Sequence, residues 1–102
     1  MLEIRPNCEC CDKDLPAASE DAHICSYECT FCTNCVETIL GNVCPNCGGG
    51  FRRRPIRPAT TRRPGIGLDF QPASNERIQS KYTIEEIAEF AGSTKSIPPS
   101  QR

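Results

Sequence analysis

The chain has no tryptophan, one methionine and six aromatic residues among its 102 positions. Large apolar side chains are therefore too few for an extensive hydrophobic core. A unit of about 50 residues with so thin a core usually needs bound metal or disulfides to stay folded. The sequence predicts a small protein whose folding depends on such cross-links.

Two kinds of apolar segment are also missing. The opening residues, Met-Leu-Glu-Ile-Arg-Pro, have neither the basic start nor the apolar stretch of a secretory signal. No run approaches the roughly 20 apolar residues that a membrane span needs. We therefore expect a cytoplasmic protein without a membrane partner. In a reducing compartment, clustered cysteines more often bind metal than form disulfides.

Charge is segregated along the chain, although the formal net charge is only −1. Residues 1–51 hold two basic and eight acidic residues, whereas residues 52–63 hold six arginines and no acid. Prolines interrupt the arginine-rich block and continue beyond it, which is typical of an extended linker. We expect residues 55–80 to form a mostly disordered basic linker.

Cysteine is what the chain has in abundance, with nine residues between Cys8 and Cys47. Eight of them form four pairs with two or three intervening residues, and Cys10 is left over. Zinc favours four thiolates at tetrahedral corners, and two such pairs complete one site. The pattern therefore predicts two metal ions, with zinc favoured over iron, and leaves open which pairs combine.

The pattern resembles that of RING fingers over about residues 6–50. Cys29-Thr-Phe-Cys32-Thr-Asn-Cys35 looks like the family's His-x-Phe-Cys-x-x-Cys segment, and Cys44-Pro-Asn-Cys47 looks like its final Cys-Pro-x-Cys knuckle. In that family, alternate pairs combine in a cross-brace, whereas adjacent pairs combine in zinc ribbons. The resemblance implies Cys8, Cys11, Cys32 and Cys35 as site 1, and Cys25, Cys29, Cys44 and Cys47 as site 2.

A second resemblance covers residues 1–54. The run Met-Leu-Glu-Ile-Arg-Pro-Asn-Cys-Glu-Cys-Cys-Asp-Lys-Asp-Leu-Pro is similar to the start of a small bacterial cysteine-rich family known as domain of unknown function 1272. Residues 25–49 are similar to that family as well. The resemblance implies a bacterial, cytoplasmic protein with a compact zinc module, and it implies no activity.

Local patterns predict the elements around the cysteines. Residues 23–25 and 30–32 suit the two arms of a hairpin. Asn34 is a suitable cap for a short helix that Gly41 would end. The expected core residues are Leu15, Ile24, Phe31, Val36, Ile39, Leu40 and Val43.

A capping box begins at Thr83, with Glu86 three residues later, and apolar residues follow at helical spacing. It predicts a short helix near the end of the chain, which Gly92 would terminate. We therefore predict a small metal-stabilised α+β fold of RING-like cross-brace, or treble-clef, type. Its parts would be a two-zinc module (1–54), the linker (55–80), the helix (81–92) and a disordered tail (93–102).

The predicted function is that of a structural zinc-binding module, a protein-interaction adaptor with an unknown protein partner. It would not be an enzyme, because a four-thiolate site has no open position for water or substrate. A thiol/zinc redox switch is one alternative, since oxidation would expel the metal. Nucleic-acid binding through Arg52–Arg63 is another, disfavoured by the acidic module. A RING-type ubiquitin ligase is the weakest, because Cys10 and Gly48 replace residues with which such ligases engage their partners.

Overall fold

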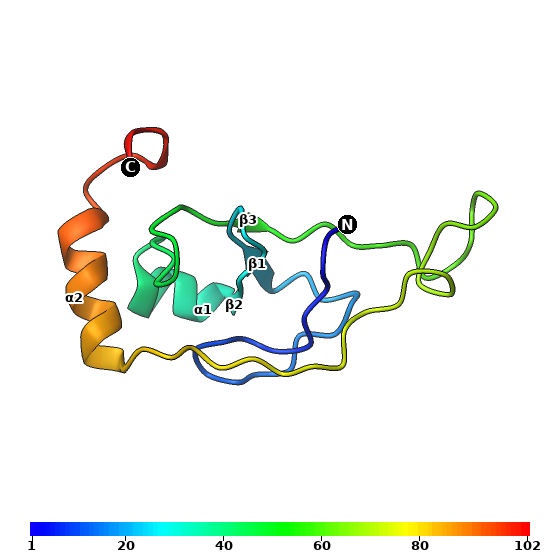
Figure 1. Cartoon of the computed structure of the whole chain (residues 1–102), viewed down its shortest axis with the longest axis horizontal. Coiled ribbons are helices and arrows are strands. Elements are labelled where there is room, and N and C mark those ends of the chain that lie inside the picture. Colours follow the sequence, from blue (N-terminus) through cyan, green and yellow to red (C-terminus); the bar gives the residue numbers. More distant parts are fainter.

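Three short strands form the sheet at the centre of the molecule (Figure 1). In the computed structural model, which describes residues 1–102, β1 (Ala22–Ile24) lies between β2 (Thr30–Cys32) and β3 (Arg52–Arg53), and both pairings are antiparallel. His23 is opposite Phe31 on one side and Arg53 on the other. The predicted hairpin is confirmed, whereas β3, which comes from the arginine-rich block, was not predicted.

A helical segment follows β2 without a loop. It consists of α1 (Thr33–Cys35) and η1 (Val36–Leu40), a π-helical turn. The predicted end is confirmed, because Gly41 has a φ of 58° and closes the turn in the left-handed conformation that glycine adopts readily. The predicted cap is wrong: Cys32 is the N-cap, and Asn34 lies inside the helix.

The core is small and is built partly from residues outside the cysteine region. Phe31 and Phe51 meet edge to face, with ring centroids 5.3 Å apart. Five of the predicted core residues are buried, whereas Ile24 and Ile39 are only half-buried. The buried apolar residues outside that predicted list include Ile4, Ala22, Phe51, Ile87 and Ala91. The last two belong to the C-terminal helix, which therefore packs on the module.

The prediction of a mostly disordered linker is wrong. Residues 72–80 run beside the N-terminal segment (Figure 1), and the backbone N–H groups of Ser74 and Ser80 donate to the carbonyls of Ile4 and Glu9. Arg57 donates to the carbonyl oxygen of Leu2 as well. The carbonyl groups of Ile4 and Glu9 lie outside the sheet and need hydrogen-bond donors, and residues 72–80 supply them. Residues 72–80 of the linker thus form an ordered strap along the module.

The C-terminal helix, α2 (Ile84–Thr94), has the predicted capping box at Thr83 and Glu86. It continues past Gly92, the predicted end, to Thr94, because a glycine permits a left-handed turn and does not impose one. The residues after it also have defined structure, since η2 (Pro99–Gln101) is a 3₁₀ turn and Arg102 donates to the carbonyl of Asn42. No helix of the chain combines the length and the apolar character that crossing a bilayer requires.

Candidate metal centres

All nine cysteines are free thiols, and seven of them form two groups. In the first group, four sulfurs lie within 4.8 Å of one another. They belong to Cys8, Cys11, Cys32 and Cys35. The first two come from the turn that follows the N-terminal segment, and the other two come from the end of β2 and from α1. The structure thus brings together two pairs that are separated in the sequence by another pair.

The first group has the dimensions of a tetrahedral thiolate site. Four sulfurs at about 2.3 Å from a tetrahedral zinc ion stand about 3.8 Å from one another. The Sγ atoms of Cys11 and Cys32 are 3.8 Å apart. Since a disulfide would need about 2.05 Å, the group suits a metal ion and not a cross-link.

The second group contains three sulfurs within 4.8 Å of one another, those of Cys25, Cys44 and Cys47. Cys29, the other residue implied for this site, lies next to them without meeting that distance to every member. Its thiol interacts with those of Cys44 and Cys25. The second pair and the fourth pair therefore converge, and the two groups are interleaved along the chain.

Proton sharing in the second group shows that its sulfurs cannot all be ionised without a cation. A hydrogen bond from Cys44 lowers the pKa of Cys29 to about 5, whereas the same bond and burial raise the pKa of Cys44. Burial also raises the pKa of Cys25 to about 11. Buried sulfurs this close cannot all be thiolates unless a positive ion offsets their mutual repulsion. A divalent metal is the natural group to do so, since it binds thiolates and releases their protons.

Nitrogen donors point at the sulfurs of both groups. Cys8 Sγ accepts from the backbone N–H of Cys11 at 3.5 Å, and Cys25 Sγ accepts from that of Tyr27 at 3.3 Å. Asn46 Nδ2 donates to Cys29 Sγ at 3.4 Å. Such outer contacts orient metal ligands and favour the thiolate over the thiol. Cys29 accepts such a hydrogen bond as well, and in this respect it resembles Cys8 and Cys25.

Access to the two groups is limited. Six of the eight paired cysteines are buried, whereas Cys11 and Cys47 are exposed, one in each group. A site closed by four thiolates offers no coordination position to a substrate. The arrangement can hold metal ions and order the chain around them.

Two further residues with side chains that can bind metal, Cys10 and His23, lie outside both groups. Cys10 is half-buried, and burial raises the pKa of its thiol although a hydrogen bond with Cys35 opposes the rise. His23 is in β1, with its Nδ1 3.4 Å from both the Asp21 carbonyl oxygen and Thr33 Oγ1. The histidine therefore has a place in the hairpin and not in a metal group.

A buried polar network between the metal groups was missed in the sequence. Glu9 is 2% exposed, and its carboxylate accepts from Arg5 Nη1 at 2.9 Å and from the backbone N–H of Thr30. Glu9 follows Cys8, and Thr30 follows Cys29, so the network joins a knuckle of each site. Burial raises the pKa of Glu9, while the bonds to Thr30 and Arg5 oppose that rise. In the sequence, Glu9 is indistinguishable from an ordinary surface acid.

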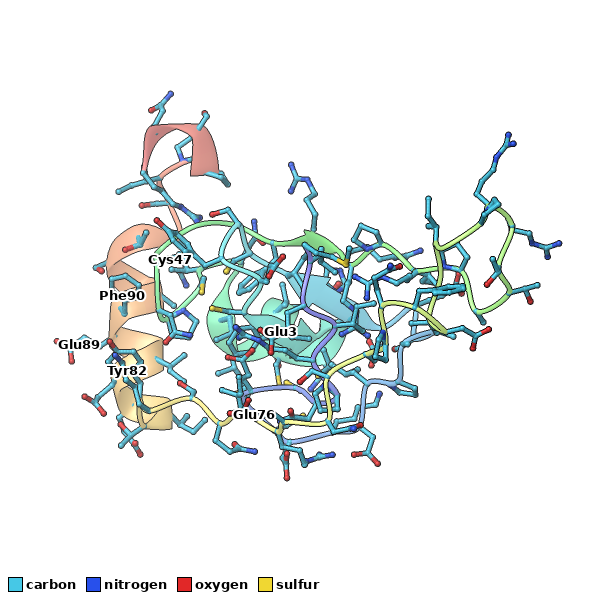
Figure 2. All side chains as sticks on the ribbon, turned by 45° about the vertical axis from the view of Figure 1, so that its right-hand side comes forward. Glu3, Cys47, Glu76, Tyr82, Glu89 and Phe90 are labelled. Carbon is cyan, nitrogen blue, oxygen red and sulfur yellow. The ribbon has the colours of Figure 1, made fainter.

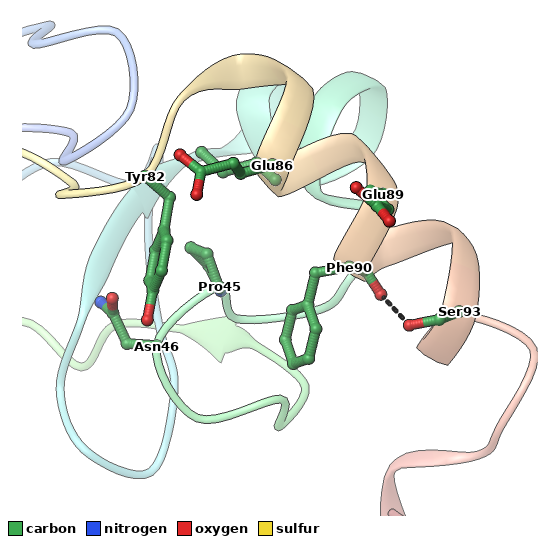
Figure 3. Close-up of a pocket in the computed structure, with 8 residues that line it drawn as sticks. Pro45, Asn46, Tyr82, Glu86, Glu89, Phe90 and Ser93 are labelled. Atoms are coloured by element: carbon green, nitrogen blue, oxygen red, sulfur yellow. Dashed lines mark hydrogen bonds between the residues drawn. The ribbon is translucent and has the colours of Figure 1, made fainter.

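A groove of about 490 Å³ lies between the Cys44–Cys47 knuckle and α2 (Figure 3). The rings of Tyr82 and Phe90 stand on either side of Pro45, and Glu86 and Glu89 are on the helix wall (Figure 3). Figure 2 shows Cys47 close to this face, beside Phe90. The sequence did not predict the groove, because Tyr82 and Phe90 are far from Pro45 along the chain.

Comparison with known proteins places the chain among relatives of unknown role. Residues 1–57 match the family described as protein of unknown function (DUF1272). An uncharacterized protein of Rhizobium meliloti (strain 1021) is 58% identical over 78 residues, which make up 76% of this chain and 86% of that protein. No solved structure matches the chain.

Proposed function

We propose that this chain, which belongs to the DUF1272 family of proteins of unknown function, is a zinc-stabilised module that acts as a protein-interaction adaptor. The observation that carries the proposal is that one knuckle, residues 44–47, contributes both to a candidate metal group and to the groove. Cys44 and Cys47 belong to a candidate metal group, and Pro45 and Asn46 between them line the groove. Metal binding would therefore hold one wall of an interaction surface in place.

The finer assignment of the metal sites is part of the proposal. We assign two zinc ions in a RING-type cross-brace, with Cys29 as the fourth ligand of site 2. The interleaving of the two groups supports this assignment, as do the contacts of Cys29 with Cys44 and Asn46. Sulfur-only donor sets of tetrahedral size suit zinc, which would supply structural cross-links. Native mass spectrometry with metal analysis measures both the identity and the number of the ions.

The groove has the composition of a protein-binding surface. Aromatic and proline side chains provide apolar contact, and two carboxylates at the rim provide orientation. Phe90 is 40% exposed, and its ring lies so close to Gly48 that a methyl group added there would be 3.4 Å from it. A partly exposed aromatic ring beside a groove offers a partner a large apolar contact area.

The adaptor proposal is tested by affinity capture with zinc-loaded protein. Phe90→Asp should abolish capture of a partner while leaving the metal content unchanged. Ile56→Asp is a matched control, since Ile56 is 46% exposed and does not line the groove. If both variants capture the same proteins as the wild-type chain, the groove is not the interaction surface.

A thiol/zinc redox switch is the second candidate, and the exposure of one cysteine in each group favours it. Cys11 and Cys47 are open to a peroxide, and Cys10 lies beside Cys35 without belonging to a group. Two thiolates, one peroxide and two protons would give one disulfide and two waters, and the loss of two ligands would release the zinc. Titrating peroxide against released zinc tests this candidate, which is excluded if the protein keeps its metal at millimolar peroxide.

Nucleic-acid binding is less favoured, because part of the arginine block is engaged within the molecule. Arg54 is 1% exposed, and Arg57 donates to the carbonyls of Gln71 and Leu2. The remaining exposed arginines would contact phosphates beside an acidic module. A filter-binding series at low and high salt tests this reading, since phosphate contacts give steeply salt-dependent affinity.

A further inference from the structure

An acidic helix face and an arginine-containing loop lie at opposite ends of the long axis. The molecule measures 46 × 27 × 18 Å, with α2 at one end and the loop of residues 58–71 at the other (Figure 1). The helix presents Glu85, Glu86 and Glu89 in its first two turns and has no basic residue before its C-cap, Lys95. The other end presents an arginine-containing loop. The helix face and the loop are therefore complementary in charge, and one chain cannot bring them together.

The loop has an ordered tip. Arg63, Pro64, Gly65 and Ile66 form a tight turn, closed by a 3.2 Å bond from the Ile66 N–H to the Arg63 carbonyl. Proline at the second position and glycine with a φ of 77° at the third are what a type II turn requires. Gln71 braces the turn, since its amide donates to the Gly65 carbonyl and accepts from the Gly67 N–H.

The loop, at its tip and just after it, exposes groups that have no partner in their own chain. Ile66 is 56% exposed and Phe70 is 57% exposed. Arg62 and Arg63 are exposed and form no ion pair, while the only acid on the loop is Asp69. An ordered loop that displays apolar and basic groups together is suited to a surface that is apolar and acidic.

The groove beside α2 is such a surface. Tyr82 and Phe90 can contact the apolar side chain of Ile66. Glu86 and Glu89 carry two charges opposite to those of the two arginines of the tip. Both partners are formed in advance, so little conformational entropy is lost on contact.

We propose that the tip, residues 62–66, of one copy docks in the groove of a second copy. The inference rests on the groove being the interaction surface proposed above, and it names the occupant. The tip and the groove lie at opposite ends of the molecule's long axis, so two antiparallel copies make the contact twice. Copies arranged head to tail make it once per neighbour. Both arrangements use the same tip and groove.

The test is sedimentation of the full-length, zinc-loaded chain over a range of concentrations. The wild type should associate reversibly, and added salt should weaken the association. A tip variant, R62E/R63E, should weaken it at least about tenfold, because like charges then face one another. A groove variant, E86Q/E89R, should do the same, and its glutamine preserves the capping box with Thr83.

Mixing the two variants gives the decisive result. In an equimolar mixture, the acidic tip meets the basic groove, and the unchanged tip meets the unchanged groove, so association should return although each variant alone associates weakly. The control R52E/R53E carries the same charge change on exposed residues of β3 and should associate as the wild type does. Zinc content and circular dichroism of each variant verify that it is folded.

Three outcomes overturn the inference: a wild type that stays monomeric up to its solubility limit, a tip variant that associates as tightly as the wild type, or a mixture that stays dissociated. Sedimentation needs no other protein, whereas the capture experiment needs one. A monomeric chain whose capture depends on Phe90 would therefore leave the adaptor function standing and assign the groove to a foreign protein.

Discussion

Arg54 shows how much one residue of the arginine block contributes to the fold. Its guanidinium is 1% exposed and donates to the carbonyl oxygens of Arg5, Leu15 and Pro16. The arginine thus ties the segment after β3 to two parts of the N-terminal loop. Burial lowers the pKa of the guanidinium, which nevertheless stays charged because the ordinary value of arginine is so high.

Replacing Arg54 with alanine should destabilise the zinc-loaded protein by about 2–4 kcal/mol, because three carbonyls, of which that of Leu15 is buried, lose a charged donor and a cavity forms. Arg53→Ala is the matched control: Arg53 is the preceding residue and is exposed, so its loss should cost no more than about 0.5 kcal/mol. Urea unfolding at constant free zinc measures both. Equal effects would show that Arg54 is not buried as described.

Asp21 is a second residue whose role follows from its contacts. Lys13 Nζ lies 2.6 Å from its carboxylate, and the backbone N–H of Thr33 donates to it at the start of α1. These bonds lower the pKa of Asp21 to about 2. A lowered pKa means that the carboxylate stabilises the fold above its ordinary pKa of about 4 and that this contribution is lost as the pH falls through about 2.

Asp21→Asn should therefore lower the stability by the same small amount at every pH from 8 to about 5, where the carboxylate is fully ionised. Salt should reduce the difference, because the ion pair with Lys13 is exposed. Thermal unfolding across this pH range measures it, with the exposed Asp69→Asn as control. A difference that changes steadily between pH 8 and 5 would contradict the assigned pKa.

At the scale of elements, the strap formed by residues 72–80 makes a prediction of its own. The amide groups of Ser74, Ile78 and Ser80 are bonded to the N-terminal segment, whereas those of Asn75 and Gln79 have no acceptor. Hydrogen exchange of the zinc-loaded protein should therefore be slow at the first three amides and fast at the other two. Uniformly fast exchange along the strap would restore the view that this segment is a disordered linker.

The strap also shows why some elements could be predicted from the sequence and others could not. The hairpin, the Gly41 stop and the capping box at Thr83 are local patterns, and the structure has all three. The order of the strap depends on carbonyls of Ile4 and Glu9, which no pattern within residues 72–80 reveals. The groove likewise joins distant segments. The cysteines were recognisable as candidate metal ligands by their spacing, whereas nothing in the sequence indicates that Glu9 is buried.

At the scale of the whole molecule, the C-terminal helix, the strap and the chain's last residues all pack on the cysteine region. α2 buries Ile87 and Ala91 against the module, the strap bonds to the segment that carries Cys8, and Arg102 reaches the loop before Cys44. Each structural zinc ion contributes roughly 10–16 kcal/mol of apparent binding energy in small peptides. Ordering a residue costs about 1–2 kcal/mol of backbone entropy, which the small core alone does not offset.

Removing the metal should therefore unfold the whole chain and not only the knuckles. With a strong chelator, the amide signals of Ser80 in the strap and of Ile87 in α2 should lose their dispersion together with those around Cys8. Restoring zinc should return them, since all nine thiols remain reduced if the buffer contains a reductant. An α2 that keeps its signals without metal would be a separate folding unit. Dispersion that is unchanged throughout the chain would mean that the thiol groups do not hold the fold, and the zinc-stabilised adaptor would lose its physical basis.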